Sequence, residues 1–450
     1  MDLASGTRPD TLPTDGNAPA TLDSSQPATD RKAMDALVIQ GGRKLSGRVE
    51  VSGAKNAALP VMAATLLTPG VHTLRNVPQL SDTRTMARVL EQLGARVEFS
   101  DHACTIDTTA VQSVEAPYDL VRTMRASIYV LGPLLARFGA ARVSLPGGCA
   151  WGPRPVNLHI EGLNAMGAAL EVEHGYLVSR GVRLKGAEFK FDAVSVGATA
   201  QLMMAATLAE GTTVLDNVAI EPDITELGAA LARCGARIEG LGTRRIAIHG
   251  VKRLEPMDTT IIPDWIEAAT FLAAAAITGG RITLARCEPA HMEAAMAKLA
   301  EAGCRFERGA GEVTVTGPTR PRAVSVTTEP FPGFPTDMQA QIMAVCAVAD
   351  GESRITDTIY LDRFTHVPEL QRLGADIRLD HNVAVVRGAP RLSGAPVMAT
   401  DIRASAALVL GALVAEGETR ISRIYHLDRG YEALDQKLAK VGASVERVQE

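Results

Sequence analysis

A glycine that follows a helical run and precedes an alternating strand pattern recurs six times along the chain, at intervals of 66 to 72 residues. A second glycine recurs in each interval, at the end of another helical run, where it suits the left-handed residue that closes many helices. Nearly equal spacing of this kind predicts one folding unit copied six times. The two sets are Gly70, Gly139, Gly211, Gly279, Gly351 and Gly417, and Gly94, Gly167, Gly235, Gly303, Gly374 and Gly442.

The repeat that spans 336–388 shows what each unit should contain. Its pattern predicts a helix that begins at Thr336 or Asp337 and is closed by Gly351, then a strand, a second helix and a hairpin. With the strand before the first helix, this is a βαβαββ-type unit of α/β class. Alanine-rich stretches such as 271–277 predict one buried helix per unit, inside strands and outer helices.

Length and composition bound the organisation of the chain. Its 450 residues exceed what one core usually organises, so two domains are expected after a tail, residues 1–33, that is too polar to order itself. A net charge of −5 gives no general reason to bind nucleic acid, and no apolar run is long enough for a membrane helix. Six cysteines without a C-x-x-C pair predict reduced thiols in a cytoplasmic protein and no metal site.

The starts of the first helices differ between repeats, so they are the first candidates for function. Three of the six hold cations. A helix start already carries partial positive charge, which makes Lys or Arg there unfavourable unless an anion binds. We therefore predict an anion site; the alternative is that these cations are solvated or pair with Asp337, Asp401 and Glu267. In chain order the six positions hold Lys55, Arg125, Gly197, Trp265, Asp337 and Arg403.

The segment 144–156 replaces an ordinary strand-to-helix connection with a loop rich in glycine and proline. It contains Cys149, and Arg154 lies five positions later, where it would lower the pKa of the thiol if the loop folds back. A reactive cysteine is the interpretation. The alternative, which we favour for the other five cysteines, is a small buried thiol.

The segment 425–434 holds a third group of polar residues. Asp428 is predicted to cap the last helix, which leaves Arg429 for phosphate or carboxylate binding. His426 is either an acid–base group or a packed ring. No Walker loop, dinucleotide-binding motif or serine elbow occurs in the sequence, so nucleotide hydrolysis and hydride transfer lack support.

Six motifs together resemble the enolpyruvyl transferase family, in the branch that acts on UDP-N-acetylglucosamine. They run in the same order from about residue 34 to the C-terminus. The resemblance implies an inside-out α/β barrel with two pseudo-threefold domains of three repeats each, namely 56–261 with the Cys149 loop, and 34–55 with 262–450. The motifs are SGAKNAALP (52–60), TMRAS (123–127), LPGGC followed by RPV (145–156), FPTDMQAQ (334–341), ATDIRAS (399–405) and IYHLDRGYE (424–432).

The resemblance also implies an activity. Such enzymes transfer the enolpyruvyl group of phosphoenolpyruvate to the 3'-hydroxyl of UDP-N-acetylglucosamine and release phosphate, the first committed step of peptidoglycan synthesis. The reaction needs an acid, a base and several cations, but no cofactor. These two small molecules are the expected partners, and the oligomeric state stays open. Alternatives are a paralogue with another nucleotide or nucleotide-sugar acceptor, and a ligand-binding homologue without activity; the GGC loop disfavours the shikimate 3-phosphate enzyme.

By resemblance, the catalytic residues are Cys149, Asp337, Lys55 and Arg403. Cys149 matches the proton donor, which fosfomycin alkylates in this family, and Asp337 matches the base beside the sugar hydroxyl. Because the two lie on different domains, closure around the ligands should assemble the site. The substrate-binding positions are Lys55, Arg154 and Arg429 for phosphate, Arg403 for carboxylate, Asn56 and Arg125 in the ligand shell, Arg154, Pro155, Val156, Asn157 and Leu158 for uridine, Ser195, Val196 and Gly197 for diphosphate, and Asp337 and Ile359 for the sugar nucleotide.

Five positions depart from the pattern of the resembling family. Its members commonly carry Lys at 81, Asp at 157, Lys at 193, Arg at 265 and Glu at 361. The changes reduce positive charge around the nucleotide and leave the positions matched to enolpyruvyl transfer intact, so they bear on the identity of the acceptor. This chain has Ser81, Asn157, Ala193, Trp265 and Leu361.

Overall fold

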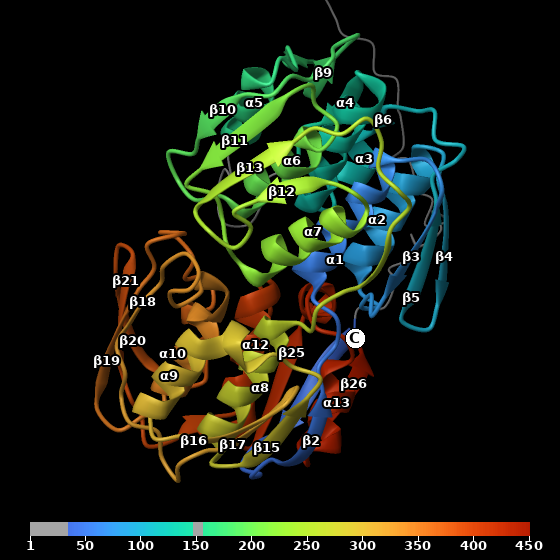
Figure 1. Cartoon of the computed structure of the whole chain (residues 1–450). Helices are drawn as coiled ribbons and strands as arrows, with labels where there is room; N and C mark the ends of the chain where they lie inside the picture. Colours follow the sequence, from blue (N-terminus) through green and yellow to red (C-terminus); the bar gives the residue numbers. More distant parts are fainter. Residues whose placement is uncertain (1–34, 147–155) are drawn as a thin grey trace, which may run out of the picture. The chain divides into compact units, whose positions relative to one another are not determined.

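The computed structural model describes residues 35–146 and 156–450, and its elements are labelled in Figure 1. Within these ranges, six sheets have four strands each and share one pairing pattern. In every one, one outer pair of strands is parallel and the other two pairs are antiparallel. The prediction of six like units is confirmed for the sheets, and five of them end in hairpins, whereas in the sixth the last strand, β26, pairs with β1 from the start of the described chain.

Three of these sheets belong to residues 54–261, which we call the inserted half. Its buried residues form one core, from Ala54 to Ile261. The strands, in spatial order, are β14 (Asp258–Thr260), β3 (Val71–Arg75), β5 (Ala103–Asp107) and β4 (Arg96–Ser100); β6 (Glu115–Ala116), β7 (Ala141–Ser144), β9 (Tyr176–Ser179) and β8 (Glu171–Glu173); and β10 (Glu188–Lys190), β11 (Thr212–Asp216), β13 (Arg245–His249) and β12 (Arg237–Glu239). The helices are α1 (Lys55–Ala64), η1 (Thr65–Leu67), α2 (Ser81–Gln92), α3 (Tyr118–Val121), η2 (Arg125–Val130), α4 (Leu131–Phe138), α5 (Asn157–Ala165), α6 (Val196–Ala206) and α7 (Pro222–Arg233).

The other three sheets belong to residues 35–51 and 265–449, which we call the discontinuous half. Its core runs from Leu37 to Val51 and from Trp265 to Ala443. The strands are β16 (Arg305–Gly309), β17 (Glu312–Thr316), β15 (Arg281–Ala285) and β2 (Ser46–Glu50); β18 (Val326–Thr327), β19 (Glu352–Thr356), β21 (Val383–Arg387) and β20 (Asp376–Asp380); and β23 (Pro396–Met398), β25 (Glu418–Ser422), β1 (Asp35–Gln40) and β26 (Ser444–Gln449), with a small pair of β22 (Leu392–Ser393) and β24 (Ala415–Glu416). The helices are α8 (Trp265–Thr278), η3 (Pro289–Met292), α9 (Glu293–Glu301), η4 (Thr336–Met338), α10 (Gln339–Cys346), α11 (Val367–Arg372), α12 (Ile402–Val414), η5 (Ile424–Arg429) and α13 (Leu434–Lys440).

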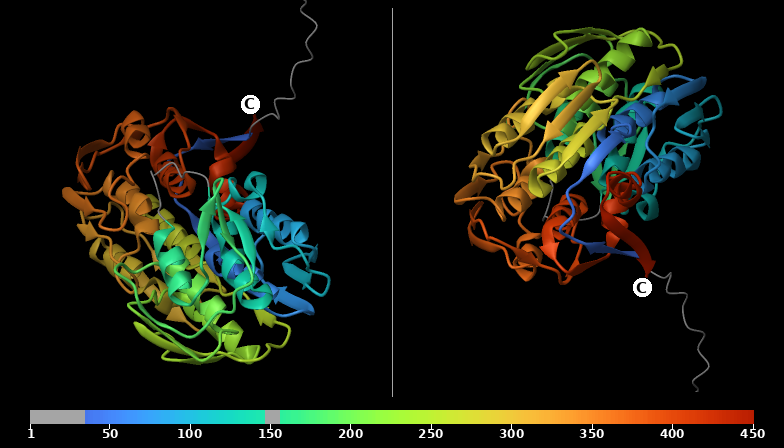
Figure 2. Two further views of the ribbon diagram at one scale, coloured as in Figure 1. Left: turned by 90° about the horizontal axis from the view of Figure 1, so that it is seen from above. Right: turned by 90° about the horizontal axis from the view of Figure 1, so that it is seen from below.

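The first helices of the repeats form the interior of each half. Every residue of α8 and of α10 is buried, and nearly every residue of α12. Figures 1 and 2 show these three helices enclosed by the strands of their half. A helix that is apolar all round needs such surroundings, and the alanines at 273–276 let its neighbours approach closely. The prediction of one buried helix per unit is confirmed for these three repeats.

Two details differ from or extend the sequence prediction. The helix expected over 336–350 is divided into η4 and α10 and ends at Cys346, because the N–H groups of Val348 and Ala349 bond three residues back and tighten the last turn. All twelve repeat-marking glycines have positive φ, as Gly351 shows with φ of 111°. No helix in the described part of the chain has the length and apolar character needed to cross a membrane.

The two halves are joined by two stretches of chain that lie side by side. The N–H of Ala54 donates to the carbonyl of Ile262 at 2.7 Å, and the N–H of Asp264 donates to the carbonyl of Ser52 at 2.8 Å. Between them, a Cβ on Gly53 would lie 1.7 Å from a backbone oxygen, so this crossing has no room for a side chain. The inserted half therefore begins and ends at one place.

Candidate active site

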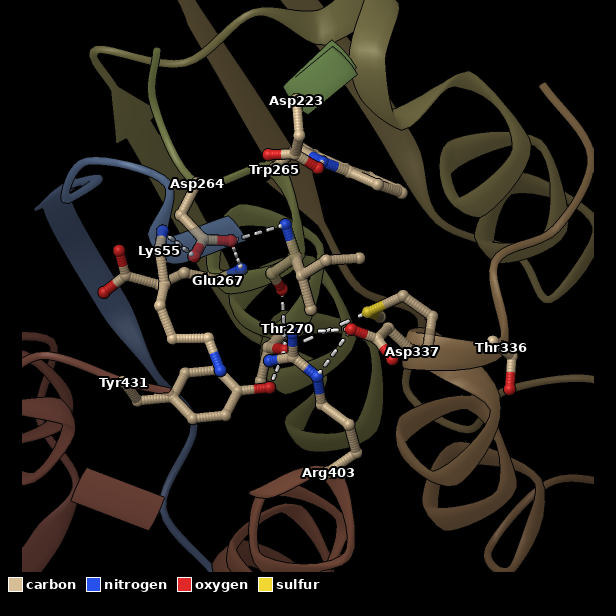
Figure 3. Close-up of polar contacts among 12 residues, drawn as sticks. Lys55, Asp223, Asp264, Trp265, Glu267, Thr270, Thr336, Asp337, Arg403 and Tyr431 are labelled. Atoms are coloured by element: carbon tan, nitrogen blue, oxygen red, sulfur yellow. Dashed lines mark hydrogen bonds and ion pairs between the residues drawn. The ribbon is translucent and has the colours of Figure 1, made fainter. Parts of the chain in front are cut away.

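Asp337 holds two arginines of the discontinuous half. Its Oδ2 accepts from Nε and Nη2 of Arg403 at 3.1 and 2.8 Å, and its Oδ1 accepts from Nη1 of Arg363 at 2.7 Å. Arg403 is the second residue of α12, whose start is capped by Asp401, and Asp337 lies in η4. Figure 3 shows the two side chains pointing toward each other. The starts of two first helices therefore meet, as their equivalent positions in the repeats predict.

Arg403 also contacts a buried polar network around Tyr431. Its guanidinium carbon lies 5.4 Å from the centre of the Tyr431 ring. The hydroxyl of Tyr431 lies 3.0 Å from Oγ1 of Thr270 and 3.1 Å from Nε2 of Gln341. Nη1 of Arg403 is buried and has no hydrogen-bond partner among the described residues. A buried donor without a partner is costly, so this nitrogen is suited to an incoming anion.

The charges of this pair are strongly coupled. Burial alone would raise the pKa of Asp337, but Arg403 and Arg363 outweigh it and hold that pKa well below its usual range. Burial alone would lower the pKa of Arg403, but Asp337 outweighs it and the pKa of Arg403 is raised. Asp337 is therefore ionised and, while both arginines hold it, a weak base.

A second carboxylate holds two further cations. Oδ2 of Asp82, in α2, lies 3.4 Å from Nζ of Lys55, the first residue of α1. Its Oδ1 accepts from Nε of Arg429, the last residue of η5, at 2.9 Å. Burial lowers the pKa of Lys55; Asp82 opposes this shift, whereas Arg403 and Arg429 add to it. Since Lys55 responds to both arginines and also to Asp337, the two clusters form one electrostatic unit.

Four of the predicted site residues thus come together, namely Lys55, Asp337, Arg403 and Arg429. The alternative, in which the cations of the helix starts pair with Asp337, Asp401 and Glu267, holds for Arg403, because Arg403 pairs with Asp337. Lys55 pairs instead with Asp82. With Arg363, the unit contains four cations and two carboxylates, which leaves an excess of positive charge for an anion.

The other predicted residues lie in the inserted half, except Ile359, which lies on the turn after β19. Arg125 begins η2 and acts electrostatically on Tyr129 and His159, and a Cβ on Gly197 would lie 3.2 Å from Nε2 of His159. Ser195 caps α6 by accepting from the N–H of Ala198 at 3.2 Å. Hydrogen bonds and ion pairs among the described residues do not connect the following positions to the Asp337 and Asp82 clusters: Asn56, Val156, Asn157, Leu158, Ser195, Val196, Gly197 and Ile359. Cys149, Arg154 and Pro155 lie outside the described residues.

Two residues of the unit, Arg363 and Asp82, are not predicted from the sequence. Both lie outside the starts of the first helices. Arg363 follows a turn after β19, and Asp82 lies in the first turn of α2, where a carboxylate is common. The turn is ordered by Asp357, whose Oδ1 accepts from the N–H groups of Ile359 and Tyr360 at 2.9 Å each. A signal for Arg363 is its place shortly after Ile359, in the one repeat that holds the carboxylate Asp337.

The expectation for Asp428 is wrong. The last helix, α13, begins after Ala433, whereas Asp428 lies in η5 and accepts from Arg447 at 2.8 and 2.9 Å. The intervening turn, with Ala433 at φ of 48°, separates η5 from α13. His426 packs its ring 4.3 Å from that of Tyr425, and burial lowers its pKa, which fits a packed ring.

Trp265, one of the five departures, forms a contact between the halves. Its Nε1 donates to Oδ2 of Asp223, in α7, at 3.2 Å, and its ring lies edge-on to Phe331 with centres 6.1 Å apart. Both Trp265 and Asp223 are buried. Burial, with Asp264 adding to it, raises the pKa of Asp223 to about 7 against the hydrogen bond from Trp265. Two of the remaining departures have ordinary surroundings: Asn157 donates to Glu161 at 3.3 Å, and Leu361 is exposed.

We expect Asp223→Asn to change how stability depends on pH. A folded pKa of about 7, raised from 3.8, contributes stability that is present below about pH 4 and is lost as the pH rises through about 7. A shift of three pKa units corresponds to about 4 kcal/mol as an upper bound. Thermal unfolding between about pH 5 and 8 should therefore show the wild type losing stability relative to Asp223→Asn as pH rises. Parallel curves would contradict this assignment.

Comparisons with known proteins show the family to which the chain belongs. The profile of the family described as EPSP synthase (3-phosphoshikimate 1-carboxyvinyltransferase) matches residues 39–438. The chain is 56% identical over 417 residues to a UDP-N-acetylglucosamine 1-carboxyvinyltransferase of Geobacter metallireducens, covering 93% of this chain and 100% of the relative. It is 54% identical over 417 residues to the protein of that name from Geotalea daltonii, with the same coverage.

Solved structures give the same result for the fold. The enolpyruvyl transferase NikO from Streptomyces tendae matches with a TM-score of 0.83 and 29% identity, over 93% of this chain and 100% of that one. EPSP synthase from Acinetobacter baumannii matches with a TM-score of 0.71 and 17% identity, over 92% of this chain and 100% of that one, which shows the fold alone. The chain belongs to the EPSP synthase family of 1-carboxyvinyltransferases, in which its curated relatives are UDP-N-acetylglucosamine 1-carboxyvinyltransferases.

Proposed function

We propose that the chain transfers the enolpyruvyl group of phosphoenolpyruvate to the 3'-hydroxyl of UDP-N-acetylglucosamine, releases phosphate, and so serves peptidoglycan synthesis. Relatives named for this transferase activity cover nearly the whole chain at 53 to 56% identity. The observation that carries the proposal is the unit of Lys55, Arg429, Arg403 and Arg363 around two carboxylates. Four cations in one site suit a substrate that bears both a phosphate and a carboxylate.

The two clusters suggest how phosphoenolpyruvate would lie. Arg403 and Arg363 offer planar forks for the carboxylate, with the unpartnered Nη1 of Arg403 as a ready donor. Lys55 and Arg429 offer charge-assisted donors for the phosphate. Charge stabilisation of the departing phosphate then comes from side chains that are already in place before the reaction.

Asp337, the base proposed for the sugar hydroxyl, is a weak base until substrate binds. Arg403 and Arg363 keep its pKa well below the usual range, and such a carboxylate accepts a proton poorly. When the carboxylate of phosphoenolpyruvate takes a share of the two arginines, the pKa of Asp337 rises and the group becomes a better base. In this proposal, binding of phosphoenolpyruvate therefore also makes Asp337 a stronger base.

The remaining steps rest on the sequence. The thiol of Cys149 would protonate the methylene carbon of phosphoenolpyruvate, while the sugar oxygen bonds to the adjacent carbon and gives its proton to Asp337. Loss of phosphate, with a proton returning from the new methyl group to the thiolate of Cys149, then restores the carbon–carbon double bond and gives the enol ether. The uridine and diphosphate positions given above, from Arg154 to Leu158 and from Ser195 to Gly197, are proposed for the nucleotide.

The proposal includes the finer architecture. Each half would be an inside-out barrel with pseudo-threefold symmetry, supported by three like sheets around buried first helices. The two domains would be 56–261, and 34–55 with 262–450, supported by two separate cores, with the difference that the core of the inserted half already begins at Ala54 and places Lys55 in that half. Substrates would bind between them, where Lys55, Asp82 and Arg429 meet.

Phosphate release tests the proposed function. The full chain, given phosphoenolpyruvate and UDP-N-acetylglucosamine, should release one phosphate for each enolpyruvyl product found by mass spectrometry. Release only with a different nucleotide or nucleotide sugar would overturn the acceptor, and no release with any acceptor would overturn the activity. Fosfomycin should add to Cys149 in the intact protein, and the five buried cysteines are internal controls in the peptide map.

A further inference from the structure

Asp82 is a buried carboxylate whose oxygens are divided between two cations. Its residue is 5% exposed, Oδ1 faces Arg429 at 2.9 Å, and Oδ2 faces Lys55 at 3.4 Å. Asp82 lies in the first turn of α2, where a carboxylate often serves as a cap. No backbone N–H among those of the described residues is recorded as donating to it, and its two recorded contacts are the cations. Capping therefore does not explain its placement.

The Asp82 contacts connect the two halves of the chain. Lys55 and Asp82 belong to the inserted half, whereas Arg429 belongs to η5 of the discontinuous half. The connection continues at Glu432, whose Oε1 accepts from the N–H of Gln79 at 2.7 Å. Without a carboxylate at this point, Arg429 would approach Lys55 against charge repulsion. Asp82 removes that repulsion and brings a cation from each half to one place.

We propose that Asp82 is a positioning residue for the phosphate of phosphoenolpyruvate, one that holds Lys55 and Arg429 at a fixed separation. The inference rests on the proposed function. Asp82 acts on the phosphate only through the two cations, since its own negative charge would repel it. Its part resembles that of Asp337 toward Arg403 and Arg363, so each anionic group of the substrate meets a pair of cations aligned by one carboxylate.

The burial of Lys55 supports this role. The side chain of Lys55 is 9% exposed, and that of Asp82 is 7% exposed. Burial favours the neutral amine, and Arg403 and Arg429 push in the same direction, whereas Asp82 is the largest of the opposing influences on the pKa of Lys55. Loss of Asp82 would therefore both free Arg429 and make Lys55 easier to deprotonate.

Steady-state kinetics with Asp82→Asn tests the proposal, because Asn keeps the size of the side chain and removes its charge. We expect the KM for phosphoenolpyruvate to rise at least about tenfold, which corresponds to a loss of about 1.4 kcal/mol, while the KM for UDP-N-acetylglucosamine stays within about twofold. The rise should be larger at alkaline pH, because Lys55 then loses its proton sooner. Asp82→Glu should recover part of the affinity. A matched control is Asp258→Asn, which removes an exposed partner of Arg75.

A second measurement separates this inference from the acceptor assignment. Inorganic phosphate, titrated calorimetrically into the full chain, should bind at least about tenfold more weakly to Asp82→Asn than to the wild type. This holds whichever sugar or nucleotide is the acceptor, so an inactive wild type with normal phosphate binding would overturn the proposed function alone. Unchanged phosphate affinity in a folded Asp82→Asn, or an equal rise in both KM values, would overturn the role of Asp82.

Discussion

Replacing Asp337 by Asn is expected to lower kcat by about 10³, within the range that one general base contributes. Asn fills the same space and its oxygen still accepts from Arg403, but its amide cannot take the proton of the sugar hydroxyl. Initial rates at saturating substrates measure the effect, and calorimetric binding of UDP-N-acetylglucosamine shows that the acceptor still binds. A kcat within about tenfold of the wild type would contradict the role of base.

The control for Asp337→Asn is a carboxylate that pairs with an arginine elsewhere. Asp216 accepts from Nη1 of Arg245 at 2.6 Å, between β11 and β13, the two middle strands of a sheet of the inserted half. Since an exposed ion pair contributes little to stability, Asp216→Asn should keep the kcat and stability of the wild type. A similar loss in both variants would point to general damage by removed ion pairs rather than to base chemistry.

Replacing Arg403 by Met is expected to raise the KM for phosphoenolpyruvate by about 10², because a desolvated bidentate contact to a carboxylate is lost. Stability should also fall, by as much as about 3 kcal/mol, because the partly buried Asp337 keeps only Arg363 as counterion. The acidic limb of kcat/KM should move to higher pH, since Asp337 loses one of the cations that lower its pKa. Kinetics from acid to neutral pH and thermal unfolding measure both effects.

Two further variants sharpen the Arg403 result. Arg403→Lys keeps the charge but loses the planar fork, so it should recover stability more than affinity. The double variant Arg403→Met with Asp337→Asn removes both charges of the pair and should be more stable than the sum of the single losses. An unchanged KM for phosphoenolpyruvate in Arg403→Met would show that the carboxylate binds elsewhere.

Much of the fold is predictable because its signals are local. A glycine at a helix end and an alternating strand act within a few residues, so six copies are visible without knowledge of their packing. The exact end of α10 is less visible, because the tight turn after Cys346 depends on how Val348 and Ala349 fit the core. The same holds for Asp428, whose partner Arg447 comes from the last strand.

The site is only partly predictable because its charges are paired over long distances. The helix starts indicate Lys55, Arg403 and Asp337, which lie at equivalent positions in their repeats. Their counterions follow no such spacing: Asp337 binds an arginine 26 residues away and another 66 residues away. Asp82 and Arg429 are 347 residues apart. Spacing within one repeat cannot reveal such pairs, because the assembly of the repeats creates them.

The side-by-side crossings at Ser52–Ala54 and Ile262–Asp264 have a mechanical consequence. The chain enters and leaves the inserted half at one place, and no sheet in the described ranges contains strands from both halves. Two cuts at this point, each resealed by a short linker, would separate the halves and leave every strand pairing of the described ranges intact, as for an inserted domain whose ends lie close together. Rotation of one half against the other would strain two peptide stretches and break side-chain contacts such as those of Trp265 with Asp223 and of Arg429 with Asp82, but it would break no strand pairing of the described ranges.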